Sequence, residues 1–294
     1  MAVAEINGLS VEYDVIGTGQ PWVVTPGGRF SKDVPGVREL AEALAAGGKK
    51  VLVWDRPNTG ASQVCFAGPS ESEMQSDVLG GLLRHLGMAP AVIAGGSGGS
   101  RVSLLTAARH PDVAAGLAVW WISGGVFGLM SLAVHYCGDS IVAAWRSGME
   151  AVADLPVWAE VVERRPANRP LLLAQDRAAF ITTLEQWMEA YCPRPDELVP
   201  GMTDDRARAL EIPALVFRSG ASDPHHTRET SERLAALLPT AQLVEPPWPD
   251  TEWNERVEAA QSEGAGLFAR WPLLAPQLLE WCPLSAGPDS SRAP

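Results

Sequence analysis

The sequence feature that most constrains the fold is a short glycine-rich turn around Ser97. Residues 95–99 read Gly-Gly-Ser-Gly-Gly, and they stand between an apolar run at 91–93 and an amphipathic run at 101–109. A strand that turns sharply into a helix through small residues can hold one serine hydroxyl, at strained backbone angles, above the edge of a sheet. Ser97 is therefore the first candidate nucleophile, although a glycine-serine cluster taken alone is also typical of an ordinary loop.

Length and charge limit the class of protein. With 294 residues the chain suits one large domain or a core with an inserted module, and we expect the second. The net charge of -12 disfavours nucleic acid and anionic membranes as partners, because no basic stripe is present to neutralise phosphates. We expect a small-molecule partner, and the sequence leaves the oligomeric state open, a homo-oligomer included.

The cysteines and the apolar segments indicate a location. Four cysteines are far apart in the sequence: Cys65, Cys137, Cys192 and Cys282. They form no C-x-x-C pair, so we expect buried thiols in a reducing compartment.

The N-terminus carries acids where a signal peptide carries bases. The uncharged segment 113–134 is long enough to imitate a membrane span, but glycines interrupt it. We therefore expect a cytoplasmic protein.

The order of apolar runs predicts an α/β fold. The chain begins with a strand hairpin that turns at Asn7-Gly8, and strand and helix then alternate as far as residue 122. This order requires a mostly parallel sheet with helices on both faces. The next segment has helical patterns and no convincing strand. Near the end of the chain, residues 267–281 predict a closing helix that Pro272 and Pro276 would bend or break. The expected division is a core at 1–122 and 212–284, an inserted all-helical cap at 123–211, and a disordered tail at 285–294.

Five landmarks occur in the order they take in the α/β-hydrolase superfamily, which the sequence resembles over nearly its whole length. Residues 25–29 (Thr-Pro-Gly-Gly-Arg) resemble the His-Gly-x loop after the third strand, and residues 55–62 resemble the D-R-x-G-x-G-x-S loop. Residues 95–99 match the nucleophile turn, residues 220–223 (Gly-Ala-Ser-Asp) resemble the G-x-x-D after the penultimate strand, and the helical block occupies the position of the cap. The resemblance implies a doubly wound sheet and acyl transfer, or an allied reaction, at a carbonyl group.

The resemblance also implies a role for each landmark. Ser97 would attack the carbonyl carbon, and Asp223 would be the acid of the triad. The N–H groups of Gly98 and of Gly28 or Arg29 would form the oxyanion hole, where the loss of one donor typically costs about 10²–10³ in rate. No cofactor is implied. No metal is expected either, because the sequence places no third ligand beside Asp223 and the two histidines that follow it.

The sequence departs from the family pattern at the catalytic base. In the family a histidine follows the last strand, whereas here the expected strand at 242–245 runs into Pro-Pro-Trp-Pro-Asp, and no histidine occurs after His226. A serine is a poor nucleophile without an adjacent base. His225 or His226 is one replacement, although an acid and a base two or three residues apart would be an unusual triad geometry. A carboxylate at the vacated position, Asp250 or Glu252, is the other.

Five further residues are candidates for contact with the substrate. His135, early in the cap, is a third imidazole that would hang over the site. Trp121 and Trp248 would line an apolar pocket, which would suit an aromatic or alicyclic group. Arg29, with Arg56, would bind a substrate carboxylate, and a structural ion pair is the alternative interpretation of Arg56.

Three functions fit these observations. The first is a capped serine hydrolase, of the esterase or lactonase kind, acting on a small, mainly apolar ester, lactone or related carbonyl compound. The second is a non-hydrolytic relative that uses the same oxyanion pocket for elimination, cyclisation or C–C bond cleavage, which the missing base makes credible. The third is a catalytically silent protein that binds a small ligand. Gly28, Ser97, Gly98 and Asp223 favour an enzyme.

Overall fold

A central sheet organises residues 1–281, which are the part of the chain that the computed structural model describes. The expected tail at 285–294 and Cys282 lie outside this part. The strands of the sheet are β1 (Ala2–Ile6), β2 (Leu9–Ile16), β3 (Gln20–Thr25), β4 (Lys49–Trp54), β5 (Ala91–Gly96), β6 (Ala114–Trp120), β9 (Ala214–Phe217) and β10 (Ala241–Val244). Their spatial order is β1-β2-β4-β3-β5-β6-β9-β10. In this spatial order the strands from β4 to β10 are parallel to one another, and β2 runs antiparallel to both of its neighbours, β1 and β4. The prediction of a mostly parallel sheet is confirmed.

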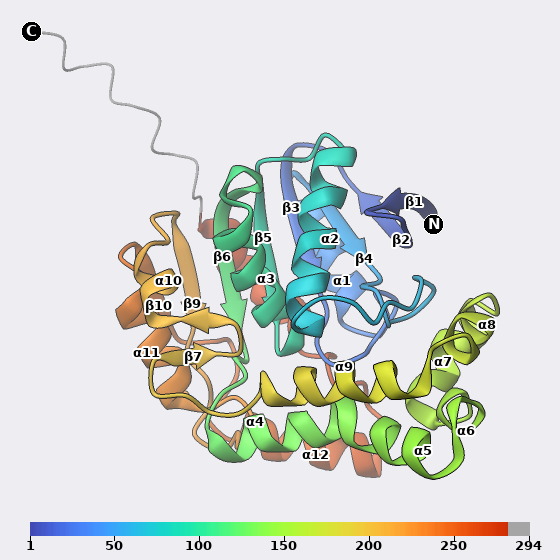
Figure 1. Cartoon of the computed structure of the whole chain (residues 1–294). Coiled ribbons are helices and arrows are strands. Elements are labelled where there is room, and N and C mark those ends of the chain that lie inside the picture. Colours follow the sequence, from blue (N-terminus) through green and yellow to red (C-terminus); the bar gives the residue numbers. More distant parts are fainter. Residues whose placement is uncertain (282–294) are drawn as a thin grey trace, which may run out of the picture.

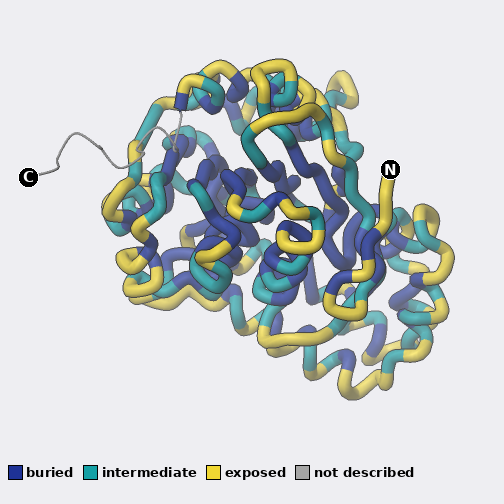
Figure 2. The backbone as a smooth tube through the Cα atoms, turned by 90° about the horizontal axis from the view of Figure 1, so that it is seen from above, coloured by how far each residue is buried: buried dark blue, intermediate teal, exposed yellow. Residues whose placement is uncertain are grey.

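Helices cover both faces of the sheet (Figure 1). The core helices are α1 (Val37–Ala46), α2 (Glu71–His85), α3 (Gly98–Arg109), α11 (Arg228–Leu237), α12 (Glu252–Ser262) and α13 (Ala275–Glu280), with 3-10 turns η1 (Pro111–Val113) and η3 (Trp271–Leu274). α2 and α3 share one apolar cluster with the sheet, and α1, η3 and α13 share a second. Figure 2 shows the result, a buried set of strands inside an exposed rim.

Local sequence signals explain where several elements begin. The hairpin between β1 and β2 turns at Asn7 and Gly8, both at positive φ (53° and 78°), as the Asn-Gly pair predicts. The hydroxyl of Ser70 accepts a hydrogen bond from the Glu73 N–H at 3.1 Å and caps α2. Pro272 lies in the first turn of η3, so the expected closing helix at 267–281 is divided into η3 and α13.

The segment between β6 and β9, which we call the cap, is mainly helical. Its helices are α4 (Val126–Ala133), the π-helical turn η2 (Val134–Gly138), α5 (Asp139–Ser147), α6 (Met149–Ala153), α7 (Pro156–Arg164), α8 (Asn168–Leu173), α9 (Arg177–Glu189) and α10 (Asp204–Arg208). Figure 1 shows α4–α9 gathered at one end of the sheet, beside the end of β6, whereas α10 lies beside α11. The expectation that this segment has no strand is wrong at β7 (Glu197–Val199) and β8 (Met202–Thr203), which are too short to show a period of two.

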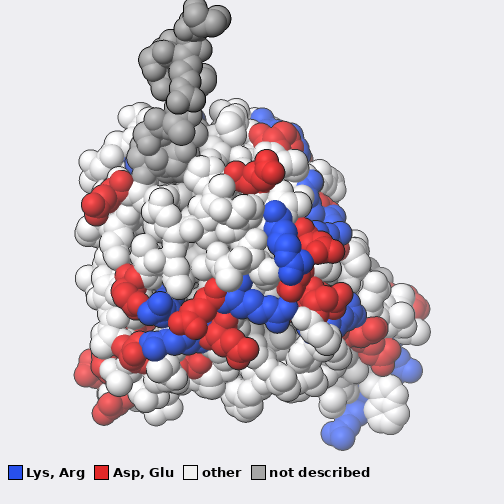
Figure 3. Space-filling view, turned by 90° about the vertical axis from the view of Figure 1, so that its left-hand side faces the viewer, with Lys and Arg blue, Asp and Glu red and all other residues white. Residues whose placement is uncertain are grey.

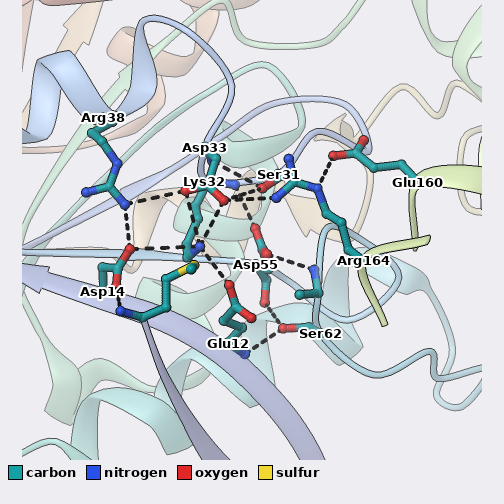
Figure 4. A network of polar contacts seen from close by, with 12 residues as sticks. Glu12, Asp14, Ser31, Lys32, Asp33, Arg38, Asp55, Ser62, Glu160 and Arg164 are labelled. Atoms are coloured by element: carbon teal, nitrogen blue, oxygen red, sulfur yellow. Dashed lines mark hydrogen bonds and ion pairs between the residues drawn. The ribbon is translucent and has the colours of Figure 1, made fainter. Parts of the chain in front are cut away.

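A buried ion-pair network ties the cap to the core (Figure 4). The Lys32 side chain is fully buried, and its ammonium donates to Glu12 at 2.9 Å and to Asp33 at 3.1 Å. The same Asp33 accepts a hydrogen bond from Arg164 of α7 at 2.9 Å. The charge of Lys32 is therefore offset by acids, and one of those acids also holds the cap.

One apolar helical run and the charge pattern on one face of the molecule are relevant to the expected cytoplasmic location. By length and composition, the run Val126–Ser147 is apolar enough to cross a membrane, and it is the only such helical run among the described residues. It comprises α4, η2 and α5, of which η2 and α5 pack against α9. Figure 3 shows one face on which basic and acidic side chains lie next to each other in a band rather than in a patch of one sign. The cytoplasmic location remains a prediction.

The described cysteines are free thiols in three different environments. Cys137 is buried and Cys65 is half-buried, but Cys192 is exposed. The expectation of buried thiols is therefore wrong for Cys192, which follows the end of α9 where the chain is solvent-facing. Burial raises the pKa of the Cys137 thiol to about 12.

Candidate active site

Ser97 occupies a strained turn between β5 and α3. Its backbone has φ 56° and ψ -124°, a conformation that residues other than glycine rarely adopt. The turn is possible because its neighbours have no side chains. A Cβ on Gly96 would lie 2.2 Å from Trp120 Nε1, and a Cβ on Gly99 would lie 2.1 Å from the Thr25 carbonyl oxygen. The sequence prediction of a sharp strand-to-helix turn at this serine is confirmed.

The loop after β3 lies directly against this turn. β3 and β5 are neighbours in the sheet although β4 comes between them in the chain, and Thr25 pairs with Gly95. Such a switch in strand order leaves room for a ligand at the carboxyl ends of the strands. A Cβ on Gly27 would lie 3.2 Å from Ser97 Oγ, and the Gly28 nitrogen is 3.2 Å from where a Cβ of Gly98 would be. The backbone of the expected oxyanion loop therefore reaches both Ser97 and Gly98.

A chain of hydrogen bonds links Ser97 to His226 and Asp223. His226 Nε2 is 2.9 Å from Ser97 Oγ, and His226 Nδ1 is 2.8 Å from Asp223 Oδ2. Serine, imidazole and carboxylate in this order form the arrangement in which an imidazole can remove the serine proton. Of the two adjacent histidines, the structure thus brings His226 to the serine.

Asp223 and His226 can form a triad pair although they are three residues apart, because the Asp223 carboxylate lies against the turn that follows it. Asp223 Oδ1 accepts hydrogen bonds from the backbone N–H groups of His225 at 2.9 Å and His226 at 3.0 Å. This leaves Asp223 Oδ2 free to orient the imidazole. α11 then begins at Arg228, and the hydroxyl of its N-cap residue Thr227 accepts a hydrogen bond from the Thr230 N–H at 3.3 Å. The triad spacing is unusual in sequence because this turn is not visible in residue spacing alone.

Electrostatics keep the Asp223 carboxylate charged. Burial alone would raise its pKa, but the charge of His226 and the hydrogen bonds from His226 and the His225 N–H outweigh burial, so the pKa of Asp223 lies below its ordinary value. An ionised Asp223 fixes the imidazole nitrogen that faces away from the serine as the protonated one, and it stabilises an imidazolium.

The other candidate bases lie elsewhere. The His225 ring packs between Phe127 and Trp253, with ring centroids at 5.5 Å and 5.0 Å. Asp250 is exposed and forms an ion pair with Arg228. His135 is on the exposed side of the cap, beside a cavity that does not include Ser97. Among residues 1–281, His226 is the side chain that hydrogen-bonds to Ser97 Oγ.

An aromatic and cationic layer lies under the triad. The Trp121 ring is stacked on the His226 ring at 6.2 Å, and Trp248 packs on Trp121 at 5.6 Å. Both indoles are buried in an apolar cluster, and neither lines a described cavity, so the structure gives them a packing role and leaves their substrate contact untested. Arg256 of α12 lies 3.8 Å from the centroid of Trp121, and its Nη2 is 3.3 Å from Asp223 Oδ2. Arg256 belongs to no sequence motif, so the sequence alone did not point to it.

Two arginines of the core loops have defined partners. Arg29 donates to Glu71 at 3.2 Å. Arg56 donates to the carbonyl oxygens of Gly27 at 3.1 Å and Gly28 at 2.6 Å, so it supports the expected oxyanion loop instead of forming the ion pair considered for it.

Tyr136 of η2 also lies near this loop, although the sequence did not point to it. Its hydroxyl oxygen is 3.5 Å from the position that a Cβ of Gly98 would take.

A cavity of about 400 Å³ opens between the cap and the oxyanion loop. It is lined by Arg29, Phe30, His135, Asp139, Leu155, Pro156, Val157 and Glu160. In the part of the chain that the structure describes, no group of three histidine, cysteine, aspartate or glutamate side chains could hold a metal ion. The groups that the structure places together at the site are Ser97, the His226 imidazole and the backbone N–H groups near them.

Comparison with known proteins identifies the fold. No family model and no curated protein matches the chain. Among solved structures it is similar to an enol-lactonase from Burkholderia xenovorans LB400, with a TM-score of 0.55, 23% identity, and coverage of 90% of this chain and 98% of that one. An esterase from Thermogutta terrifontis has a TM-score of 0.55 at 22% identity, covering 90% and 98% of the two chains. A meta-cleavage product hydrolase from Pseudomonas fluorescens has a TM-score of 0.55 at 19% identity, covering 90% and 96%.

These similarities cover nearly all of each chain, and another similar structure is described as an alpha/beta hydrolase from Sphaerobacter thermophilus. The chain therefore has the α/β-hydrolase fold, as the resemblance in its sequence implied.

Proposed function

We propose that this chain is a serine hydrolase that cleaves an ester, a lactone or a related carbonyl group of a small molecule. The observation that carries the proposal is the continuous line of hydrogen bonds from Ser97 Oγ through His226 to Asp223, with distances of 2.9 Å and 2.8 Å. The similar solved structures include an enol-lactonase and an esterase, which supports the same class of reaction.

The proposal implies a two-step reaction. As Ser97 Oγ bonds to the carbonyl carbon, its proton passes to His226 Nε2, and the N–H groups of Gly28 and Gly98 stabilise the oxyanion. The bond to the leaving oxygen then breaks, and His226 gives that oxygen its proton. Water attacks the resulting acyl-enzyme, again losing a proton to His226, and the carboxylic acid departs as the serine recovers its proton. Asp223 holds the imidazole throughout.

The position of His226 bears on the two other functions. The non-hydrolytic hypothesis drew on the lack of a base after the last strand, and an imidazole at 2.9 Å from Ser97 Oγ removes that reason. A silent binding protein would have no need for the strained serine or the bonded imidazole.

The free thiols of Cys65, Cys137 and Cys192 support a reducing, cytoplasmic setting, and we propose neither a membrane nor a nucleic-acid partner.

Steady-state hydrolysis tests the proposal. We expect the wild-type protein to hydrolyse short 4-nitrophenyl esters or a simple lactone, and we expect Ser97→Ala and His226→Ala each to lower kcat by about 10⁴-fold or more. The double variant should be no worse than either single variant, because the residues act as one unit. His225→Ala is the matched control and should lose less than about tenfold. Loss of activity in His225→Ala with activity kept in His226→Ala would refute the assignment.

A further inference from the structure

Two polar groups approach the oxyanion hole from the side of the cap and the neighbouring loop. Arg56 Nη1 and Tyr136 Oη each lie 3.5 Å from the position that a Cβ of Gly98 would take, and the Gly28 nitrogen lies 3.2 Å from it. A guanidinium, a phenol and a backbone N–H therefore converge on one point beside Ser97. The second residue of this group, Tyr136, comes from the π-helical turn η2, and such turns occur often at functional sites.

Two more guanidinium groups flank Tyr136. The guanidinium carbon of Arg29 is 5.5 Å from the Tyr136 ring centroid, and that of Arg101 is 5.7 Å from it. Arg29 also lies 4.4 Å over the Trp158 ring, and Arg101 donates to Tyr191 Oη at 3.1 Å. Three arginines from the oxyanion loop, the loop after β4, and α3 thus meet at one tyrosine of the cap.

The positive charge of this cluster exceeds its negative charge. Among the described residues, Glu71 is the carboxylate that bonds any of these guanidinium groups, through Arg29. Arg56 bonds two carbonyl oxygens, and Arg101 bonds two hydroxyl groups. Burial, with a contribution from the charge of Arg101, lowers the pKa of Arg56 to about 10 despite the opposing effects of Tyr136 and Glu71. An anion in this space would relieve the imbalance.

The cluster also contains buried donors without partners. Arg29 Nε and Nη1, Arg56 Nε and Arg101 Nε are all buried and make no hydrogen bond within the described part of the chain. Buried polar groups in proteins are nearly always paired, so several orphaned N–H groups at one place indicate a missing acceptor. Planar guanidinium forks match the two oxygens of a carboxylate.

From these observations we infer that the arginine cluster, Arg29, Arg56 and Arg101 with Tyr136, is a carboxylate-binding subsite. The inference rests on the proposed function and names its substrate class, an ester or lactone that carries an ionised carboxylate close to the scissile carbonyl. It narrows the mainly apolar substrate expected from the sequence: the substrate has an apolar body and one anionic end.

A described cavity borders one member of this subsite. Arg29 lines the cavity of about 400 Å³, a volume that suits a small ligand. Two acids share the same lining. Glu160 is paired with Arg164 at 2.8 Å, and Asp139 is exposed, where water and salt screen its charge. Neither acid contacts the guanidinium groups.

A matched pair of substrates tests the inference on the wild-type protein. Mono-4-nitrophenyl glutarate carries a carboxylate at the end of its acyl chain, and 4-nitrophenyl valerate has a chain of the same length without the charge. A hydrogen-bonded charge pair predicts a kcat/KM about 10- to 100-fold higher for the glutarate ester, mainly through KM. A ratio near one or below it would overturn the inference while leaving the proposed hydrolase intact.

Variants and direct binding complete the test. Arg29→Met and Arg101→Met should each lower the ratio of the two kcat/KM values by about fivefold or more, whereas Arg84→Met, which removes an exposed charge paired with Asp112, should leave the ratio unchanged. Calorimetric titration of Ser97→Ala with glutarate reports the subsite without catalysis. Binding that disappears in Ser97→Ala/Arg29→Met supports the subsite even if no ester is hydrolysed, and absence of binding to Ser97→Ala contradicts it.

Discussion

Arg256 is the residue whose removal gives the most informative change in stability. Its guanidinium lies 3.3 Å from Asp223 and 3.1 Å from Glu252, and all three side chains are nearly fully buried. At an effective dielectric constant of about 20, two unit charges at this distance attract by about 5 kcal/mol before the cost of desolvation is subtracted. Removing one member of a buried pair typically costs about 3–5 kcal/mol, because the other charge remains buried without a partner. We expect Arg256→Met to lower the free energy of unfolding by about 3 kcal/mol at about pH 8.

The pH dependence of this loss has a defined sign. Burial raises the pKa of Glu252 above its ordinary value even with Arg256 present, and removal of the arginine raises it further. A carboxyl group whose folded pKa is raised destabilises the fold when it is ionised, and the penalty disappears as the pH falls through the folded pKa. The loss caused by Arg256→Met should therefore shrink to about half at about pH 5.

Urea denaturation at the two pH values measures the change in the free energy of unfolding. The proteins compared are the wild type, Arg256→Met and the double variant Arg256→Met/Glu252→Gln. The double variant should recover most of the loss at about pH 8, because the unpaired buried carboxylate is gone. Arg270→Met is the control, since its partner Glu255 is exposed and the loss of this pair should change the free energy of unfolding far less than Arg256→Met does. A loss below about 1 kcal/mol for Arg256→Met, or a loss that grows at low pH, would refute the reasoning.

Three other predictions concern single positions. Asp223→Asn should keep the fold and lower kcat by about 10⁴-fold, because the imidazole loses the group that sets its tautomer, and a melting curve beside the ester assay checks both parts. Gly99→Ala should lower the free energy of unfolding by about 1–3 kcal/mol in urea titrations, because the new methyl group would fall 2.1 Å from the carbonyl oxygen of Thr25. In a thiol-reagent assay on the native protein, Cys192→Ser should remove one fast-reacting thiol, whereas Cys137→Ser should leave the fast phase unchanged, because burial raises the pKa of Cys137 to about 12.

Much of the fold was predictable because its signals are local. Strand and helix alternate with clear periodicity, and the turns at Asn7-Gly8 and around Ser97 consist of residues that their backbone conformations require. The hairpin of β7 and β8 was missed because strands of three and two residues show no period. A break was expected at the prolines, and both Pro272 and Pro276 lie in the first turns of the two elements, η3 and α13, into which the segment divides.

The candidate site was predictable in part. Ser97, Gly28 and Asp223 stand in short motifs that follow β5, β3 and β9, so they lie at the same edge of the parallel sheet. The choice between His225 and His226 was not, because it depends on which ring the Asp223 turn directs toward the serine.

Residues outside the motifs were harder to find. Arg101, Tyr136 and Arg256 come from three helical segments, and only tertiary packing brings them to the site. A buried charge on a helix gives no periodic signal, so the sequence does not distinguish such a residue from one on a solvated face.

The central claim is that His226 activates Ser97. Peptide-mapped labelling with a fluorophosphonate tests it most directly, because this reagent reacts with a serine only when an adjacent base activates it. We predict one labelled peptide, containing Ser97, in the wild type and in His225→Ala. We predict that the label falls by about 10³-fold or more in His226→Ala, with the melting temperature showing that the variant is folded. Undiminished labelling of Ser97 in folded His226→Ala, or labelling lost only in His225→Ala, would contradict the account.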